Sequence, residues 1–291
     1  MGLKNFGLQN LKFKDYMEVI SKSMIEKWIV PYLSIGKRGA KADVAIGAIV
    51  RAILHRLKTG VQWRFLPLKA FFDAGAITWN GVYYHYSKWV RDGSFQKAWT
   101  AILKAHKALL DLSSMQLDGS HTPAKGGGEN MGYQGRKAAK TTNALFFVDK
   151  NGQPVAMATP QRGNRHDLYE IKTLFEQMCQ SLEDADITVK GIFLNADAGF
   201  DAEELRTLCG EKEIEANIAD NPRNGTLSQT YQHFDEELYK ERYVIERTNA
   251  WLDSFKTLLI RFEKNINSWM AQHFMAFSVL LLRKNTPLLK Y

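Results

Sequence analysis

The chain has 291 residues, of which 45% are hydrophobic and 24% are charged, with a net charge of +8. This composition suits one large domain or two ordinary ones and excludes a disordered or low-complexity polypeptide. No run approaches the roughly 18 apolar residues of a membrane-spanning helix, and the opening residues lack the apolar stretch of a signal peptide. Two cysteines, Cys179 and Cys209, fit no metal-binding spacing and are typical of reduced thiols in a cytoplasmic protein.

Basic residues are concentrated in the first third of the chain. Residues 1–110 contain 18 Lys and Arg against 6 Asp and Glu, whereas residues 111–291 contain 21 against 25. This asymmetry is typical of a polyanion-binding module joined to a part that uses carboxylates. A solvated basic surface without a partner is the alternative, and charge alone does not separate the two.

The basic third has a helical pattern. Asp43 is a plausible N-cap, and the apolar residues from Val44 to Leu57 recur at helical spacing until Gly60. Thr78 can cap a second helix that reaches about Arg91, and a third runs from Ser94 to about Leu110. Short basic helices of this kind predict a helix-turn-helix-like module. The residues that we expect to contact DNA there are Arg51, Arg56, Lys58, Arg64, Lys88 and Arg91.

After about residue 113 the pattern changes to alternating strands and helices. The predicted elements are a strand over 115–118, a glycine-marked mobile loop over 119–141, a hairpin over 144–158 with Asn151-Gly152 in its turn, a helix over 167–182, a strand over 189–197, a helix over 201–209, a strand over 214–218 and a helix over 235–283. This order predicts an α/β fold with a mixed sheet.

Two of the predicted strands end in an acid, Asp118 and Asp197. Ligand sites of open α/β sheets gather at the carboxyl ends of strands, and two carboxylates converging there would bind a hard divalent cation. A strand-end Asp is also common as a turn former or helix cap, and each acid taken alone fits that interpretation. Asp201 competes with Asp197 for the second position, but the apolar strand leads directly into Asp197.

A third acid, Glu246, lies four residues after Arg242 in a predicted helix. Alone, the two would form an ordinary surface ion pair. Beside two metal-binding aspartates, Glu246 could complete the metal site and Arg242 could hold a phosphate.

For His121, a structural or phosphate-contacting role is favoured. For His166-Asp167, the pattern favours a turn-and-cap arrangement, and for Trp251 it favours core packing.

Five segments occur in a fixed order, namely Thr59–Pro67, Leu117–His121, Gly163–Asp167, Ala196–Asp201 and Arg242–Leu252. Together they resemble the bacterial insertion-sequence transposases with a DDE catalytic triad, specifically the insertion-sequence-five group, over about residues 38–285. Tyr239, Arg242 and Glu246 match the family's helix pattern, but Asp253 stands where the family has Lys. Lys256, about one turn further along, is the candidate to replace that Lys as a phosphate contact.

The resemblance implies a ribonuclease-H-like catalytic domain over 111–291, preceded by an all-helical DNA-binding domain over 1–110. It implies that Asp118, Asp197 and Glu246, spaced by 79 and 49 positions, hold two Mg²⁺ ions, which Mn²⁺ can replace. It also implies cleavage and strand transfer of DNA at terminal inverted repeats, target DNA as a second substrate, a homodimer on DNA, and a bacterial, nucleoid-associated protein of the cytoplasm. Arg136 and Lys137 would contact the DNA backbone.

Two other functions remain open at this point. A catalytically silent descendant would only bind the repeats. A ribonuclease-H-like repair or recombination nuclease would share the three acids but would cut a branched structure.

Overall fold

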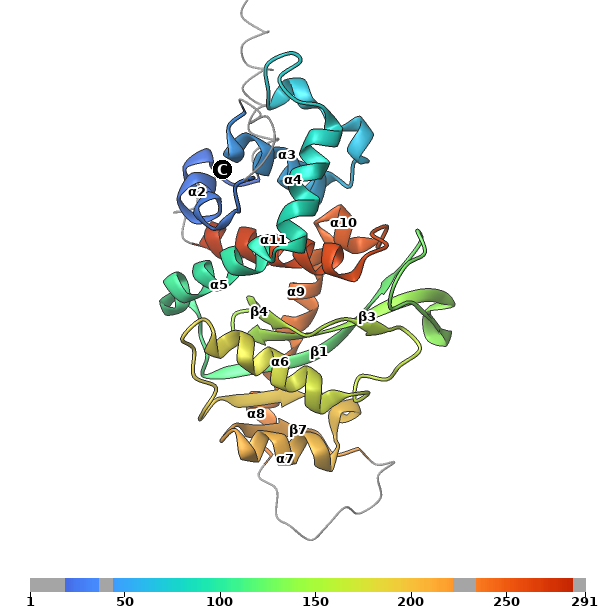
Figure 1. Cartoon of the computed structure of the whole chain (residues 1–291). Coiled ribbons are helices and arrows are strands. Elements are labelled where there is room, and N and C mark those ends of the chain that lie inside the picture. The colour runs from blue at the N-terminus through green and yellow to red at the C-terminus, as the bar shows by residue number, and fades with distance from the viewer. Residues whose placement is uncertain (1–18, 37–43, 222–233, 285–291) are drawn as a thin grey trace, which may run out of the picture. The chain divides into compact units, whose positions relative to one another are not determined.

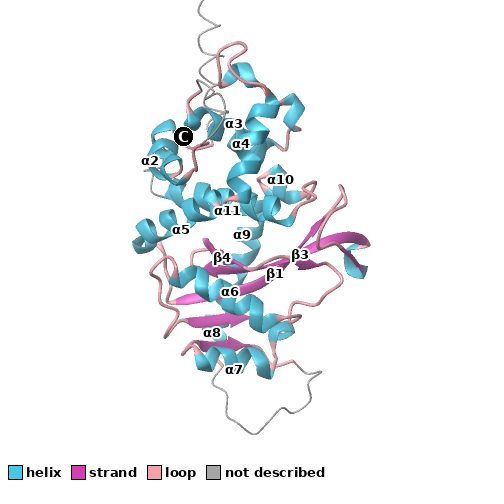
Figure 2. Ribbon diagram, in the orientation of Figure 1, coloured by secondary structure: helices cyan, strands magenta, loops and turns pink. Residues whose placement is uncertain are grey.

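A computed structural model describes residues 19–36, 44–221 and 234–284 of the chain. The chain divides into two compact units. The first comprises Met1–Trp99, Phe255–Thr257 and Ala271–Tyr291, and the second comprises Thr100–Ser254 and Leu258–Met270. Every strand of the described residues belongs to the second unit (Figure 2). The first unit therefore also includes C-terminal residues, and a functional boundary at residue 110 stays a prediction.

Helices and short turns build the first unit (Figure 1). Its elements are α2 (Lys22–Trp28), η1 (Val30–Tyr32), α3 (Ile46–Thr59), η2 (Trp63–Phe65), η3 (Leu68–Ala70), α4 (Trp79–Arg91) and the beginning of α5 (Ser94–His106). The predicted helices over residues 44–57, 79–91 and 94–110 are confirmed to within a few residues. Asp43, the predicted N-cap, lies outside the described residues, and Ala45 is the N-cap of α3.

Local sequence explains where these helices begin and end. The apolar spacing of α3 buries Ile49, Ile53 and Leu57 along one face. Gly60 then ends α3 in the left-handed conformation, with φ of 72°, and donates its N–H to the carbonyl of Arg56. At the start of α4, Thr78 Oγ1 accepts the N–H of Gly81 at 3.3 Å, as predicted for its cap.

The second unit is built on a seven-stranded mixed sheet. Its strands are β1 (Ser114–Pro123), β2 (Gly132–Gln134), β3 (Ala139–Asp149), β4 (Pro154–Met157), β5 (Gln161–Arg162), β6 (Phe193–Ala196) and β7 (Glu215–Ile218). The order is β2-β3-β1-β6-β7, with β4 and β5 also paired to β3. β1 is antiparallel to β3 and parallel to β6, which is parallel to β7. This arrangement confirms the predicted α/β fold with a mixed sheet.

Several strand limits differ from those predicted. Residues 119–123 continue β1, and residues 132–134 and 139–141 form strands, so much of the predicted loop is part of the sheet. Conversely β6 begins only at Phe193, because Gly191 adopts a positive φ of 78° and turns the chain before it. The predicted hairpin is confirmed: β3 and β4 are antiparallel, and Gly152 in their turn has φ of 84°.

In the part of the chain that the structure describes, six further α-helices lie between residues 171 and 284. They are α6 (Ile171–Glu183), α7 (Glu203–Glu211), α8 (Glu236–Lys240), α9 (Val244–Asp253), α10 (Lys256–Leu259) and α11 (Ile266–Lys284), with short turns η4 (Lys107–Leu109), η5 (Gly135–Lys137), η6 (Ala198–Phe200) and η8 (Glu241–Tyr243). Parts of α10 and α11 belong to the first unit. The predicted continuous helix over 235–283 is thus wrong, since a non-helical stretch separates α10 from α11. Among the described helices, none is both long and apolar enough to cross a membrane.

Candidate active site

Asp118 and Asp197 lie at neighbouring positions of two parallel strands. β1 and β6 pair with Gln116 opposite Asn195. Continuing that register by two residues places Asp118 opposite Asp197, which directly follows β6. Neighbouring strands are about 4.8 Å apart, and side chains alternate between the faces. Both carboxylates therefore lie on the face that carries Gln116 and Asn195, and the structure brings the two predicted acids together.

The face that carries the aspartates is the one on which α8 packs. Asn195 donates its side-chain amide to the carbonyl of Leu238 in α8 at 3.0 Å, and α9 contacts β1. The opposite face is covered by α6, whose Phe175 ring packs against Phe147 with centroids 5.5 Å apart. Figure 1 shows α6 and α9 on opposite sides of the sheet.

Arg242 is the cation that faces the two aspartates. Its Nη2 lies 3.8 Å from Asp197 Oδ2, and its Nη1 donates to the hydroxyl of Tyr239 at 3.3 Å. The ring of Tyr239 also lies under the guanidinium, 5.2 Å from its carbon. The Nε of Arg242 is buried and has no hydrogen-bond partner among the described residues. The terminal nitrogens of the guanidinium therefore provide its contacts to Asp197 and Tyr239.

The electrostatic environment of Asp118 disfavours its charge. Burial raises the pKa of Asp118 to about 6, and the nearby carboxylates of Asp167 and Asp197 act in the same direction. The N–H of Gly119 and the guanidinium of Arg242 oppose this effect without cancelling it. The site therefore has a deficit of positive charge that a cation would correct.

Glu246 is placed differently from the two aspartates. It lies in the first turn of α9 and is exposed, in a stripe with Tyr243, Arg247 and Ala250. Within the described ranges, no three acidic, His or Cys side chains are close enough to hold one metal ion. The structure does not gather Glu246 into a three-acid cluster, and its role as a metal ligand stays a prediction.

Two family models match this chain. A family model described as "DDE superfamily endonuclease" matches residues 117–281, more than half of the chain. The chain belongs to this family. A second model, "Putative transposase of IS4/5 family", matches residues 24–99. Membership of the DDE family implies dependence on a divalent metal ion.

Individual relatives are more distant. The chain is 31% identical over 128 residues to the "Putative transposase for insertion sequence element IS402" of Burkholderia cepacia, covering 41% of this chain and 52% of that protein. The chain thus matches about half the length of this curated relative. The solved structure "Mos1 transposase paired-end complex with left transposon end" aligns with a TM-score of 0.29 and 11% identity over 92% of this chain and 88% of that one, which is too weak a likeness to support an argument.

Asp201, the competitor of Asp197 within the DDE domain, has a structural role. Its carboxylate is 8% exposed and accepts the Nε of Arg206 at 2.9 Å, with the Nη2 at 2.8 Å. It also accepts the N–H of Asn221 at 2.8 Å. These bonds join the segment after β6 to α7 and to the residues after β7. The carboxylate of Asp201 is therefore used for contacts within the fold.

Asp167 is an acid near the site that sequence reasoning missed. The expected cap is wrong, because α6 begins at Ile171 with Glu170 as an N-cap that makes no side-chain hydrogen bond. Asp167 instead lies against β1: a Cβ on Gly119 would come within 2.3 Å of its Oδ1. Buried Asn143 donates to that same oxygen at 2.6 Å. The close approach of Asp167 thus explains why residue 119 is a glycine. In the sequence, the only sign of this contact is the glycine that directly follows Asp118.

The basic residues predicted to contact DNA differ in their availability. In the first unit, Arg56 is 9% exposed and stacks on Trp63 with 4.4 Å between guanidinium carbon and ring centroid. Lys88 donates to the carbonyl of Ser34 at 2.7 Å. By contrast Arg64 and Arg91 are exposed.

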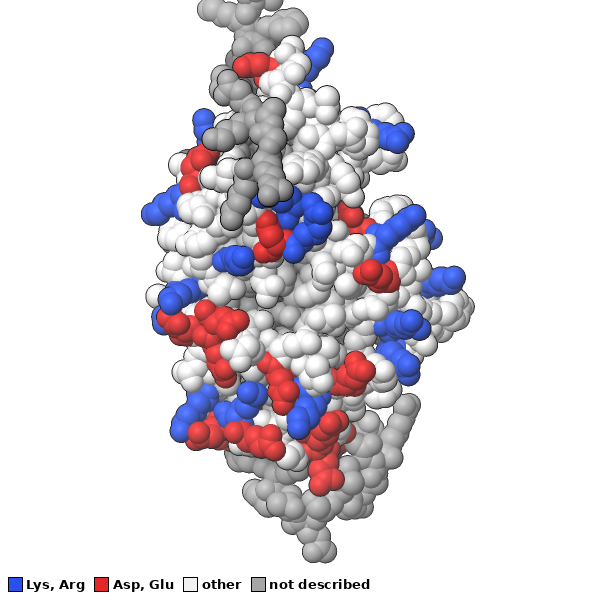
Figure 3. Space-filling view, in the orientation of Figure 1, with Lys and Arg blue, Asp and Glu red and all other residues white. Residues whose placement is uncertain are grey.

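The other predicted cations lie on several elements. The Nζ of Lys58 is 5.0 Å from the ring of Phe255, and Arg51 lies 5.7 Å from that of Phe71. Lys256 packs beside Gly60 in the first unit. Arg136 and Lys137 are exposed in η5, and Lys137 donates to the carbonyl of His121 at 2.8 Å. Figure 3 shows Lys and Arg at several separate places on one face, so charge alone does not mark one DNA-binding surface.

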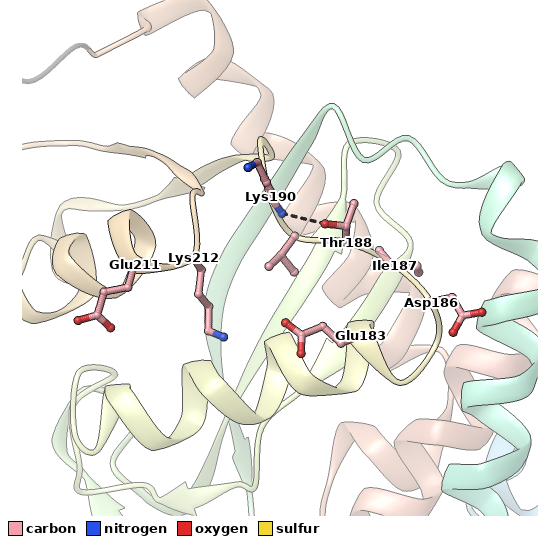
Figure 4. Close-up of a pocket in the computed structure, with 8 residues that line it drawn as sticks. Glu183, Asp186, Ile187, Thr188, Lys190, Glu211 and Lys212 are labelled. Carbon is pink, nitrogen blue, oxygen red and sulfur yellow. Dashed lines mark hydrogen bonds between the residues drawn. The ribbon is translucent and has the colours of Figure 1, made fainter.

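A pocket elsewhere in the second unit contains none of the predicted site residues. It lies beside the end of α6, and the side chains that line it include Glu183, Asp186, Lys190 and Lys212 (Figure 4). Acids and lysines alternate there, and Lys190 pairs with Glu213 at 2.6 Å. This pocket, which Ile187 and Val189 also line, is at the opposite end of the strands from the two aspartates.

Proposed function

We propose that this chain is a DNA transposase that binds the terminal inverted repeats of its element, cuts a phosphodiester bond there and joins the freed 3′ end to target DNA. The observation that supports this proposal most is the pair of neighbouring aspartates, Asp118 within β1 and Asp197 at the end of β6, facing Arg242 in a member of the DDE family. Sites of this kind at the carboxyl ends of strands suit phosphate-containing ligands.

The donor set fits a divalent cation. Mg²⁺ commonly takes one or two carboxylates together with substrate phosphates, and Asp118 and Asp197 supply two carboxylates side by side. Burial, with a smaller contribution from neighbouring acids, raises the pKa of Asp118, and a bound cation would favour its charged form. When bound, two Mg²⁺ or Mn²⁺ ions would activate the attacking water or 3′ hydroxyl and stabilise the leaving 3′ oxygen. We assign Asp118 and Asp197 to hold them, with Glu246 of α9 as the third carboxylate.

Arg242 would position the phosphate that is attacked. Its buried Nε has no partner among the described residues, and its Nη2 lies beside Asp197. A guanidinium binds phosphate oxygens through two parallel hydrogen bonds, which fixes the orientation of the group. The scissile phosphate would then lie between Arg242 and the two aspartates, with Tyr239 supporting the guanidinium from beneath.

We assign recognition of the repeats to the basic residues within 1–110, with exposed Arg64 and Arg91 as the leading contacts, and phosphoryl transfer to 111–291. Because two ends of one element must be joined, two copies of the chain would act together on DNA. Arg136, Lys137 and Lys256 would contribute backbone contacts.

The test is cleavage of a linear duplex that carries the element's own ends, with Mg²⁺ or Mn²⁺ present. Wild type should nick the duplex and transfer the strand. Asp118→Asn and Asp197→Asn should still bind the duplex but lose both reactions by orders of magnitude. The activity of Glu246→Gln tests whether the third carboxylate is needed for these reactions. Asp220→Asn, whose side chain is 93% exposed, is the matched control that should leave activity unchanged.

Other outcomes would point to the other functions. Wild type that binds the ends but never cuts them with either metal would indicate a silent repeat-binding protein. Cleavage of branched but not linear DNA would indicate a repair or recombination nuclease.

A further inference from the structure

An exposed aromatic side chain lies on the catalytic sheet, away from the two aspartates. Tyr133 of β2 is 62% exposed, although the ring of a tyrosine normally finds cover on a sheet face. Its cross-strand partner is Lys140 of β3, and both belong to the second unit. An exposed aromatic ring beside a cation suits a ligand that has both a flat ring face and a negative charge.

The register shows that Tyr133 and Asp118 share a face of the sheet. Asp118 pairs with Phe146, and alternation along β3 puts Lys140 on the same face as Phe146. Tyr133 pairs with Lys140 and therefore lies on that face too. Ser120 and Thr122 lie between them on β1 and are partly exposed. On the same face of β3, Ala144 and Thr142 are buried, and Thr142 Oγ1 accepts the Nη1 of Arg261 at 2.6 Å. The partly exposed residues that lead from the acids towards Tyr133 are therefore those of β1.

The charges around Tyr133 favour a polyanion. Lys140 and Arg136 are exposed, and within the described ranges neither forms an ion pair with an acidic side chain. Lys137, in the same turn, is fixed by its bond to the carbonyl of His121.

We propose that Tyr133 stacks on an unpaired base of the DNA strand next to the cleaved bond, while Lys140 and Arg136 contact its phosphates. The proposal rests on the function proposed above and adds a specific contact to it. A cationic track with an aromatic platform is the usual construction of a single-strand binding surface, because every base offers a ring face. Tyr133 lies about six residues along the strands from Asp118, roughly 20 Å, so the stacked base would be several nucleotides along that strand from the cleaved bond.

The experiment uses the full chain without divalent metal and a mixed-sequence single-stranded oligonucleotide that carries the fluorescent base 2-aminopurine. Wild type should quench the 2-aminopurine on binding. Tyr133→Phe should keep both affinity and quenching, whereas Tyr133→Ala should bind about tenfold or more weakly and lose the quenching. Lys140→Ala should lower the salt dependence of binding by about 0.7 in the log–log slope.

Matched controls lie at the far end of the strands. Phe193 is 38% exposed at the start of β6, and Lys190 is 67% exposed in its pair with Glu213. Phe193→Ala and Lys190→Ala should bind the oligonucleotide as wild type does. Melting temperatures of all variants should stay at the wild-type value, because each substituted side chain is exposed.

Two results would overturn the proposal. One is equal affinity and quenching in wild type and Tyr133→Ala. The other is a changed oligomeric state of Tyr133→Ala with unchanged DNA affinity, which would assign the surface to a second copy of the chain. Wild type that cuts transposon ends without any dependence on Tyr133 would refute only this inference, whereas stacking without any cleavage would refute only the proposed transposase function.

Discussion

Replacing Asp118 by Asn should make the metal-free protein more stable at neutral pH. The folded chain holds the Asp118 proton more tightly than the unfolded chain, because burial and two neighbouring acids raise its pKa from 3.8 to about 6. Above pH 6 the native state must therefore carry a charge that its surroundings disfavour. A difference of about 2 in pKa corresponds to at most about 3 kcal/mol of unfolding free energy. Asn keeps an acceptor for the N–H of Gly119 but carries no charge.

The size of the effect can be followed in the melting temperature. About 2–3 kcal/mol corresponds to roughly 5–10 °C for a protein of this size. With a chelator present, the Asp118→Asn variant and wild type should melt alike near pH 4, where both side chains are neutral. The difference in melting temperature between variant and wild type should appear as the pH rises through 6, with the variant melting higher at pH 8. Subtracting wild type from variant removes the titration of every other group.

A divalent metal ion should reverse the sign of this difference in melting temperature. A cation that binds only the native state stabilises it in proportion to the logarithm of its concentration over Kd. Mg²⁺ or Mn²⁺ should therefore raise the melting temperature of wild type and leave that of Asp118→Asn unchanged. A gap that is constant between pH 4 and pH 8, or a variant that melts below wild type at pH 8, would refute the reasoning. Asp220→Asn, with its exposed carboxylate, should show no gap at any pH.

Three further predictions follow from contacts outside the acid pair. Gly119→Ala should cost about 1–3 kcal/mol of unfolding free energy, because its Cβ would meet Asp167 at 2.3 Å, and urea unfolding should show a smaller loss when Asp167→Ala is added. Asp201→Asn should lower stability by about 1.5–3 kcal/mol in the same assay, since it removes the charged, hydrogen-bonded partner of Arg206, whose only other acidic partner among the described residues is the more distant Asp220 at 3.5 Å. Arg64→Ala and Arg91→Ala should each weaken duplex binding and lower its log–log salt slope by about 0.9, measured by fluorescence anisotropy over a salt series.

Local features of the fold were predictable because local chemistry decides them. Apolar periodicity and a glycine C-cap define α3, and the cap of Thr78 defines α4. The Asn-Gly turn defines the β3–β4 hairpin in the same way. Each of these signals lies within a few residues of the structure that it specifies.

Features that depend on distant contacts were not predictable in the same way. The pairing of Asp118 with Asp197 spans 79 positions and was reached only through strand-end chemistry and a family resemblance. From the sequence alone Asp167 is interpreted as a helix cap, because its real contacts, the side chain of Asn143 and the backbone of Gly119, are distant in the sequence. Arg56 looked like a DNA contact because nothing local to α3 shows that Trp63 folds back over it.

The most direct test of the central claim is the affinity of the full chain for Mn²⁺, measured by electron paramagnetic resonance of the free ion. If Asp118 and Asp197 together hold the divalent cation, wild type should bind Mn²⁺ and Asp220→Asn should bind it equally well. Asp118→Asn and Asp197→Asn should each bind at least about tenfold more weakly, because each removes one of the charged oxygen ligands. Equal Mn²⁺ affinity in wild type and both active-site variants would contradict the account.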